Sequence, residues 1–191
     1  MQSNGRNSLK AQYKMEPIID KNFLTQEQKN FINNELLSPF CPYYFNSNSV
    51  GNDGNKYLSH AVLRRAEERD ENELFNSSYS EQITDIFKTF IIKNKIDCKE
   101  MLRCCINLTF KTNSIACPVH KDHEFDHKNL LVYLNDCVDK NAKTVLLDDN
   151  KEKITHEFEP EQYKGLCFGG VPHYMIYPTK DIRVVLVYTF R

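Results

Sequence analysis

MLRCCINLTF, residues 101–110, marks the point at which the chain changes from a helix-type to a strand-type sequence. Apolar and polar side chains alternate along it, and this period of two predicts a strand with one face in the core. Several short strands with turns between them then predict a sandwich or barrel. The short apolar runs that continue the pattern are residues 129–135, 143–148, 153–158, 165–168, 173–177 and 182–190.

Upstream of this stretch the sequence predicts helices. Thr25 and Gln28 have the spacing of a capping box, and the apolar positions after them predict an amphipathic helix over about 25–37. A second helix is expected with Ser80 as its N-cap, because apolar residues recur at helical spacing over 83–91. Helices followed by a run of strands predict a mainly β fold with flanking helices.

The chain has the length of one domain. Its 191 residues suffice to bury a core, and no internal repeat divides them. We therefore expect a single domain over 1–191, with a flexible segment at 1–15, helical support over about 16–100 and a β core over about 101–191. Residues 46–56, NSNSVGNDGNK, predict a loop because they are rich in Asn, Ser and Gly.

The overall composition disfavours two classes of partner. The net charge is −1, from 25 basic and 26 acidic side chains, which gives no electrostatic footprint for nucleic acid. No apolar run approaches the length needed to cross a membrane. The seven cysteines include no C-x-x-C pair, and the first 16 residues are polar, so we expect reduced thiols and a cytoplasmic location. No feature of the sequence specifies an oligomeric state.

The segment His120-Lys121-Asp122 contains two metal-type ligands. In an extended strand, residues i and i+2 project from the same face, so the imidazole and the carboxylate would point to one place. One distant histidine, His173, can complete a set of three. Two histidines and one carboxylate with open positions opposite them form the donor set of non-haem Fe(II) oxygenases.

Other pairings are open within the same segment. The residues VHKDHEFDH, 119–127, also offer His123 with Asp126 or with His127. A solvated turn rich in histidine and acid is the simplest alternative. Spacing within the segment does not choose between these interpretations.

Arg183 lies in the strand predicted over 182–190, whose two faces are both apolar. A guanidinium buried in such a strand requires an anionic partner. The sequence fixes no Asp or Glu in that position, and a bound dicarboxylate would supply the partner in bidentate geometry. The alternative is that Arg183 reaches water at the start of the strand or pairs with Asp181.

The order and spacing of these motifs resemble the prolyl-hydroxylase-like branch of the 2-oxoglutarate/Fe(II) dioxygenases. The intervals between them also fit that branch, which favours His120 and Asp122 over the alternative of His123 and Asp126. The resemblance is strong over about 100–191 and loose over about 16–99. Its motifs are H-x-D at 120–122, Tyr133-Leu134-Asn135, Pro172-His173 with Pro178, and Arg183 inside the last strand.

The resemblance implies a double-stranded β-helix, which is a cupin-like jelly roll. It implies that His120, Asp122 and His173 hold Fe(II) as the catalytic centre. Arg183 would bind the distal carboxylate of the cosubstrate 2-oxoglutarate, and Tyr133 would donate its hydroxyl to the same group. The implied reaction uses O2, with ascorbate as a reductant, to hydroxylate a C–H bond while succinate and CO2 are released.

The resemblance implies that the substrate is a prolyl or other peptidyl side chain of a protein or peptide, and a small metabolite or a nucleobase is the alternative. Two hypotheses from other functional classes are an inactive jelly-roll binding module and a zinc hydrolase. The presence of all three ligands together with Arg183 favours the oxygenase. The family often has a tyrosine near the position of Phe110 that contacts the metal-side carboxylate of the keto acid, so no residue takes that role here.

Further residues are candidates for the rim of the pocket. Arg103 and Asn107 lie on the polar face of the strand at 101–110. His60 and the pair Arg64-Arg65 are candidates to flank the opening, and the loop at 46–56 is a candidate lid over the substrate, because functional residues concentrate on loops around a rigid scaffold.

Overall fold

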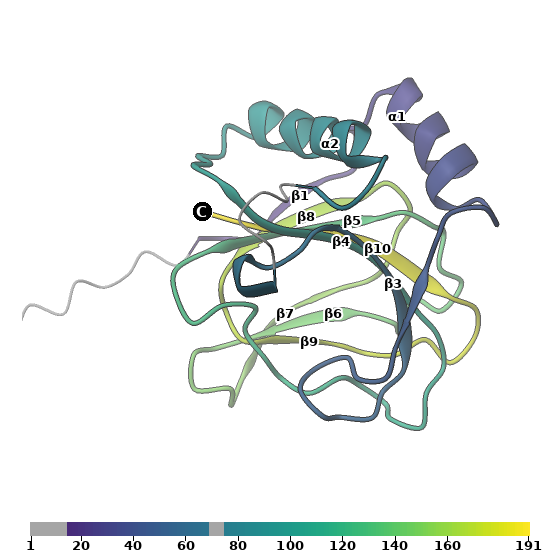
Figure 1. The fold of residues 1–191 in the computed structure, drawn as a ribbon. Coiled ribbons are helices and arrows are strands. Elements are labelled where there is room, and N and C mark those ends of the chain that lie inside the picture. Colours follow the sequence, from purple (N-terminus) through teal and green to yellow (C-terminus); the bar gives the residue numbers. More distant parts are fainter. Residues whose placement is uncertain (1–14, 69–74) are drawn as a thin grey trace, which may run out of the picture.

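The computed structural model describes residues 15–68 and 75–191, and it consists mainly of antiparallel β structure (Figure 1). Its strands are β1 (Ile18–Asp20), β2 (Tyr44–Asn46), β3 (Tyr57–Leu63), β4 (Met101–Thr109), β5 (Lys128–Tyr133), β6 (Thr144–Leu147), β7 (Ile154–Phe158), β8 (Gly165–Gly169), β9 (His173–Met175) and β10 (Arg183–Phe190). Its helical elements are α1 (Gln26–Phe31), a π-helical turn (Ile32–Leu36), a 3-10 turn (Ala66–Glu68) and α2 (Ser80–Lys93).

Two sheets lie face to face. The larger has seven strands in the order β1-β8-β5-β10-β4-β3-β2, and the smaller has three in the order β7-β6-β9. In Figure 1 the helices lie over the outer face of the larger sheet, and the smaller sheet lies on the opposite side. Each strand predicted from residue 101 onward is present, from β4 to β10.

The region expected to give helical support also contributes strands β1, β2 and β3, which extend both ends of the larger sheet. The sequence of β3 shows no simple alternation, because parts of both of its faces are buried, including the polar His60. A strand covered on both sides has no period-two pattern by which it can be recognised.

The two predicted helices form, with differences at their ends. The capping box of α1 is confirmed: Thr25 Oγ1 accepts from the Gln28 N–H at 3.2 Å, and Gln28 Oε1 accepts from the Thr25 N–H at 3.0 Å. The N-cap of α2 is Tyr79 and not Ser80, which is the first helical residue. No side chain caps this helix directly, although Ser77 Oγ accepts from the N–H of Tyr79 at 3.0 Å.

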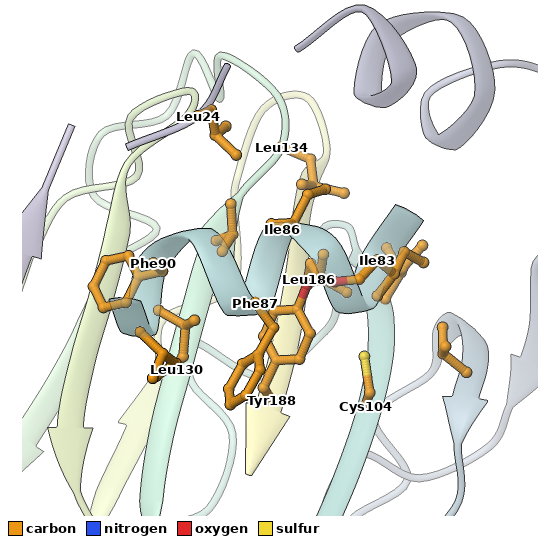
Figure 2. Close-up of a cluster of buried hydrophobic side chains, with 14 of the residues drawn as sticks. Leu24, Ile83, Ile86, Phe87, Phe90, Cys104, Leu130, Leu134, Leu186 and Tyr188 are labelled. Carbon is orange, nitrogen blue, oxygen red and sulfur yellow. Dashed lines mark hydrogen bonds between the residues drawn. The ribbon is translucent and has the colours of Figure 1, made fainter. Parts of the chain in front are cut away.

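The main core lies between α2 and the outer face of the larger sheet. Figure 2 shows Ile83, Ile86, Phe87 and Phe90 projecting from α2 toward the strands. Gly165 of β8 permits this close approach, because a Cβ at that position would lie 2.4 Å from a ring carbon of Phe90. The apolar spacing read from the sequence therefore identifies the face of α2 that is buried.

A smaller core fills part of the space between the two sheets, and it consists of Leu131, Tyr133, Leu146, Phe158, Leu166, Phe168 and Val185. Beside it, the inner faces of β4 and β10 carry polar side chains. In the register of this pair Arg183 lies opposite Thr109, and Thr189 lies opposite Arg103 six residues further along. The pair therefore places one arginine near each end of the inner face.

Among the described residues, no helix combines the length and the apolar character that crossing a bilayer requires.

Candidate metal centre

His120, Asp122 and His173 converge in the space between the sheets. His120 and His173 form an isolated antiparallel bridge, with His120 N donating to His173 O at 3.0 Å and His173 N donating to His120 O at 2.9 Å. One potential ligand atom from each of the three side chains lies within 4.8 Å of those of the other two. Residues separated by more than 50 positions thus form one donor set.

The segment leading to His120 is less regular than the strand that the sequence suggests. Residues 111–127 form no strand, and their backbone pairs with the rest of the sheet structure only at two isolated bridges, Ala116 with Ile176 and His120 with His173. These two bridges attach the segment to β9 and the residues after it. The H-x-D pair is therefore oriented by contact with His173, not by a regular sheet of its own.

Backbone carbonyls fix the orientation of both histidine rings. His120 Nδ1 lies 2.9 Å from the carbonyl oxygen of Pro118, and His173 Nδ1 lies 2.9 Å from that of Val171. A carbonyl only accepts, so Nδ1 is the protonated nitrogen in each neutral ring and Nε2 carries the lone pair. A hydrogen bond of this kind from the outer nitrogen is typical of histidines that ligate metals.

The two oxygens of the Asp122 carboxylate have different neighbours. Its Oδ1 lies 3.5 Å from Arg65 Nη2 and 3.6 Å from Arg103 Nη1, while Oδ2 lies 3.4 Å from His173 Nε2. Arg65 Nη1 also donates to the backbone carbonyl of Asp122 at 2.5 Å. Since Oδ2 and a neutral Nε2 are both acceptors, their close approach requires a cation between them, either a proton or a metal ion.

The charge states of Asp122 and His120 suit a cation. Burial by itself raises the pKa of Asp122, but the hydrogen bond and charge of His173 and the charge of Arg103 outweigh it and hold the pKa well below its usual range. Burial and the neighbouring His173 lower the pKa of His120. An ionised carboxylate beside a neutral imidazole is the protonation state that metal binding needs. Burial by itself lowers the pKa of His173, but the hydrogen bond and charge of Asp122 outweigh it and raise the pKa, so a metal ion bound here would take the place of a proton on this ring.

The alternative ligands do not form a group of three, although the rings of His123 and His127 lie edge to face with their centres 4.9 Å apart. His123 Nε2 lies 2.8 Å from Thr189 Oγ1, and the buried ring of His127 lies against Gly170, where a Cβ would approach it to 2.5 Å. Among the described residues, His120, Asp122 and His173 form the one cluster of three side chains close enough to share an ion. Geometry therefore distinguishes the pairings that spacing left open.

Arg183 is buried at the start of β10, with 4% of its surface exposed. Its Nη2 donates to Thr144 Oγ1 at 2.9 Å, its Nη1 lies 3.0 Å from the sulfur of Met175, and its Nε has no partner among the described residues. Asp181, the acidic partner considered from the sequence, instead accepts from Val138 N at 3.5 Å. Arg183 is thus a buried cation without a carboxylate at salt-bridge distance in the described chain.

Tyr133 and Thr144 stand beside this guanidinium. The Tyr133 hydroxyl lies 2.8 Å from Thr144 Oγ1, and the guanidinium carbon of Arg183 lies 5.2 Å from the centre of the Tyr133 ring. Three hydrogen-bonding groups therefore meet at one end of the site. Thr144 was not predicted as a site residue, because a threonine in a buried strand is ordinary.

A cavity of about 380 Å³ joins the two groups of residues. Arg183 and Thr144 line it together with the three potential metal ligands, and so do Arg103 and Asn107, two of the residues on the polar face of β4. The remaining lining residues are Ser49, Val50, Gly51, Tyr57, Arg65, Glu68, Thr109, Cys117, Lys121, Leu131, Tyr174, Met175, Val185 and Val187.

The loop of residues 47–56 reaches this cavity and is anchored there. Ser49 Oγ lies 2.5 Å from Asp53 Oδ2 and 2.7 Å from the Tyr177 hydroxyl. Burial alone raises the pKa of Asp53, but hydrogen bonds from Ser49 and Asn55 outweigh it and lower the pKa to about 2. This Asp53 clasp holds the tip of the loop at the edge of the cavity.

The residues considered for the rim divide into two groups. Arg65 lines the cavity and contacts Asp122. His60 is buried away from it, with Nδ1 at 2.7 Å from the Pro42 carbonyl and Nε2 at 2.7 Å from Ser77 Oγ. His60 therefore has a structural role in joining β3 to two neighbouring segments.

The chain was compared with known proteins. No family model matches it, and no curated protein sequence matches it. Solved structures do match, among them an oxidoreductase of the 2OG-Fe(II) oxygenase family from Burkholderia pseudomallei, with a TM-score of 0.71 at 16% identity, over 91% of this chain and 84% of that one.

Prolyl hydroxylases are also among the matches. The one from Trichoplax adhaerens, in complex with a peptide fragment of the hypoxia inducible factor oxygen degradation domain, has a TM-score of 0.62 at 14% identity, over 91% of this chain and 82% of that one. The prolyl-4-hydroxylase from Pseudomonas putida has a TM-score of 0.59 at 12% identity, over 92% of both chains. Together with the two facing sheets, these similarities confirm the predicted fold class: the chain has the double-stranded β-helix fold of the 2OG-Fe(II) oxygenases and prolyl hydroxylases.

Proposed function

We propose that this chain is an Fe(II)- and 2-oxoglutarate-dependent dioxygenase. The observation that carries the proposal is a donor set of two histidines and one carboxylate in the same cavity as a buried arginine that has no carboxylate partner in the described chain. A buried guanidinium is costly unless an anion accompanies it. One divalent cation and one dicarboxylate would satisfy both groups.

In this proposal His120, Asp122 and His173 hold the iron. Their outer hydrogen bonds keep Nε2 of each ring directed inward, and the two guanidinium groups beside Oδ1 leave Oδ2 of Asp122 available for the metal. Three protein ligands leave coordination positions open for the keto acid and O2. Bound there, iron and 2-oxoglutarate would supply the oxidising chemistry that converts C–H to C–OH with release of succinate and CO2.

Arg183 would bind the distal carboxylate of 2-oxoglutarate, and Tyr133 would donate its hydroxyl to the same carboxylate. Thr144 Oγ1 now contacts both of these side chains, so it would join or yield to the incoming group. The guanidinium lies among Tyr133, Thr144 and Met175, which excludes bulk water from the ion pair. A charge-assisted, bidentate contact in such surroundings orients the cosubstrate as well as binding it.

For the substrate we propose a prolyl or other peptidyl side chain. Two of the similar solved structures are prolyl hydroxylases, and one of them is in complex with a peptide. The anchored loop forms part of the cavity wall through Ser49, Val50 and Gly51. A segment of chain laid across this wall would bring one side chain to the metal.

The test is the conversion of 2-oxoglutarate to succinate by the purified protein with Fe(II), O2 and ascorbate. We expect slow succinate formation without a substrate, and loss of that formation when a chelator removes the metal. Binding of 2-oxoglutarate is measured separately, by calorimetry with Mn(II) in place of iron. A protein that neither binds the keto acid nor forms succinate would be the inactive jelly-roll module, and the proposal would be abandoned.

A further inference from the structure

The end of the cavity opposite Arg183 carries more positive charge than the orientation of Asp122 needs. Arg103 and Arg65 both lie beside Asp122, and their side chains are 21% and 23% exposed, against 8% for Asp122. They come from different elements, β4 and the segment that follows β3. One carboxylate therefore stands between two guanidinium groups in a partly buried place.

Counting charges shows that the imbalance extends to the whole cavity. Among the described lining residues, four are cationic (Arg65, Arg103, Lys121 and Arg183) and two are anionic (Glu68 and Asp122). A divalent metal ion and a doubly negative keto acid would cancel each other. Lys121 Nζ also lies 4.0 Å from Asp149 Oδ1, outside the lining. With that pair counted, a net charge of about +1 would remain among partly buried side chains, where an uncompensated charge is unfavourable.

We infer that Arg65, Arg103 and Lys121 form a second anion subsite at the open end of the cavity, and that the substrate carries a carboxylate or phosphate group there. The inference rests on the proposed function and specifies the chemistry of its substrate. The anion pairs with guanidinium N–H groups that Asp122 leaves free, since each guanidinium has five donors. The reacting carbon of such a substrate is held between this subsite and the metal.

Two carboxylates compete for these cations: Asp149, whose Oδ1 lies 4.0 Å from Lys121 Nζ, and Glu68. Glu68 lies on the same rim, and its side chain is exposed. If Glu68 already neutralised the subsite, its replacement by glutamine would create an anion preference that the native protein lacks. If the subsite is available, Glu68→Gln strengthens a preference that the native protein already shows. The native protein therefore distinguishes the two cases: it prefers an anionic probe only if the subsite is available.

The experiment measures the binding of matched neutral and anionic probes beside the metal. The protein is loaded with Mn(II), which does not support turnover, and saturated with 2-oxoglutarate to occupy Arg183. The line broadening of probe protons by Mn(II) is then recorded for N-acetyl-aspartate amide and N-acetyl-asparagine amide, and for the N-acetyl amides of phosphoserine and serine. The first pair represents a carboxylate substrate, and the second represents a phosphate substrate.

We expect an anionic probe to be broadened at a concentration at least about ten-fold lower than its neutral counterpart, since a hydrogen bond to a charged group contributes about that factor. In Arg65→Gln and Arg103→Gln this ratio should fall toward one. Arg65 lies outside the strands, so Arg65→Gln keeps the test available if Arg103→Gln does not fold. Lys88→Gln, on the exposed face of α2, is the control that removes one positive charge away from the cavity.

Equal broadening of the two members of both probe pairs would overturn the inference. A preference that persists in Arg65→Gln and Arg103→Gln would overturn it as well, since the anion would then bind elsewhere. Preference for one probe pair over the other supports the inference and identifies the anion. Binding of Mn(II) and 2-oxoglutarate is measured first, so a native protein that binds neither contradicts the proposed function, and a failure of the subsite alone is recognised separately.

Discussion

The two faces of β4 and β10 differ sharply, although the same two strands form both of them. On the outer face, four side chains are fully buried and belong to the core under α2: Cys104, Ile106, Leu186 and Tyr188. On the inner face the same strands present arginines, Asn107 and Thr109 to a cavity. Because side chains alternate along a strand, one face of a sheet can form an apolar core while the other face carries the polar residues of a site.

The difference indicates where the free energy of folding comes from. The outer face buries large apolar groups without polar atoms that need partners, apart from the Tyr188 hydroxyl, which donates to the Ile83 carbonyl at 2.7 Å. The inner face buries a guanidinium without a carboxylate and an Asn129 side chain without a partner among the described residues. Buried polar groups of this kind cost stability, so the outer core must offset them.

Removing a ligand should produce the largest effect and affect only the inner face. In Asp122→Ala we expect iron-dependent succinate formation to fall by more than about 100-fold, since even residues that merely support a ligand account for up to that factor. The circular dichroism spectrum should remain that of the native protein, because the outer core is unchanged. Full activity in this variant would move the ligand assignment to His123 and Asp126.

A substitution in the outer core should have the opposite profile. Phe90 is fully buried and packs edge-on against Phe23, with ring centres 5.0 Å apart. Phe90→Ala should lower the free energy of unfolding by about 3–5 kcal/mol, as large cavities in apolar cores do. The apparent affinity for 2-oxoglutarate of the protein that remains folded should be unchanged. A parallel loss of cosubstrate affinity would mean that the two faces are coupled.

Arg183→Leu should separate the two groups within the inner face. We expect the concentration of 2-oxoglutarate needed for half-maximal succinate formation to rise by at least about ten-fold, because a charge-assisted contact is lost. The concentration of Fe(II) needed should change little, since Arg183 contacts none of the three ligand side chains. Arg183→Lys keeps the charge and should be intermediate. An unchanged requirement for 2-oxoglutarate would place the anion site elsewhere.

The Asp53 clasp should give the smallest effect, and one that depends on pH. Its folded-state pKa of about 2 lies below the value of about 3.9 expected when unfolded, so its contribution to stability is present above about pH 4 and is lost as the pH falls toward 2. Urea unfolding of the native protein and of Asp53→Asn should therefore differ at pH 5 and converge near pH 2. A difference that stays constant over this range would show that Asp53 titrates normally.

Much of the fold could be read from the sequence because its signals are local. Period two in β4 and helical spacing in α2 follow from one buried face on each element, and Thr25 with Gln28 specifies the start of α1. Strands β1 to β3 lack such signals. Two of them have three residues each, and they join the sheet because neighbouring strands offer free backbone groups.

The sequence by itself determined the chemical types and the order of the site residues: His120 and Asp122 two positions apart, His173, and Arg183 in an apolar strand. Only the tertiary structure decided which histidines meet and which arginines surround Asp122. The physical reason is that the bridge between His120 and His173, and the approach of Arg65 and Arg103 to one carboxylate, join parts of the chain that are far apart in sequence. Such contacts depend on the packing of one sheet against another, which no local pattern encodes.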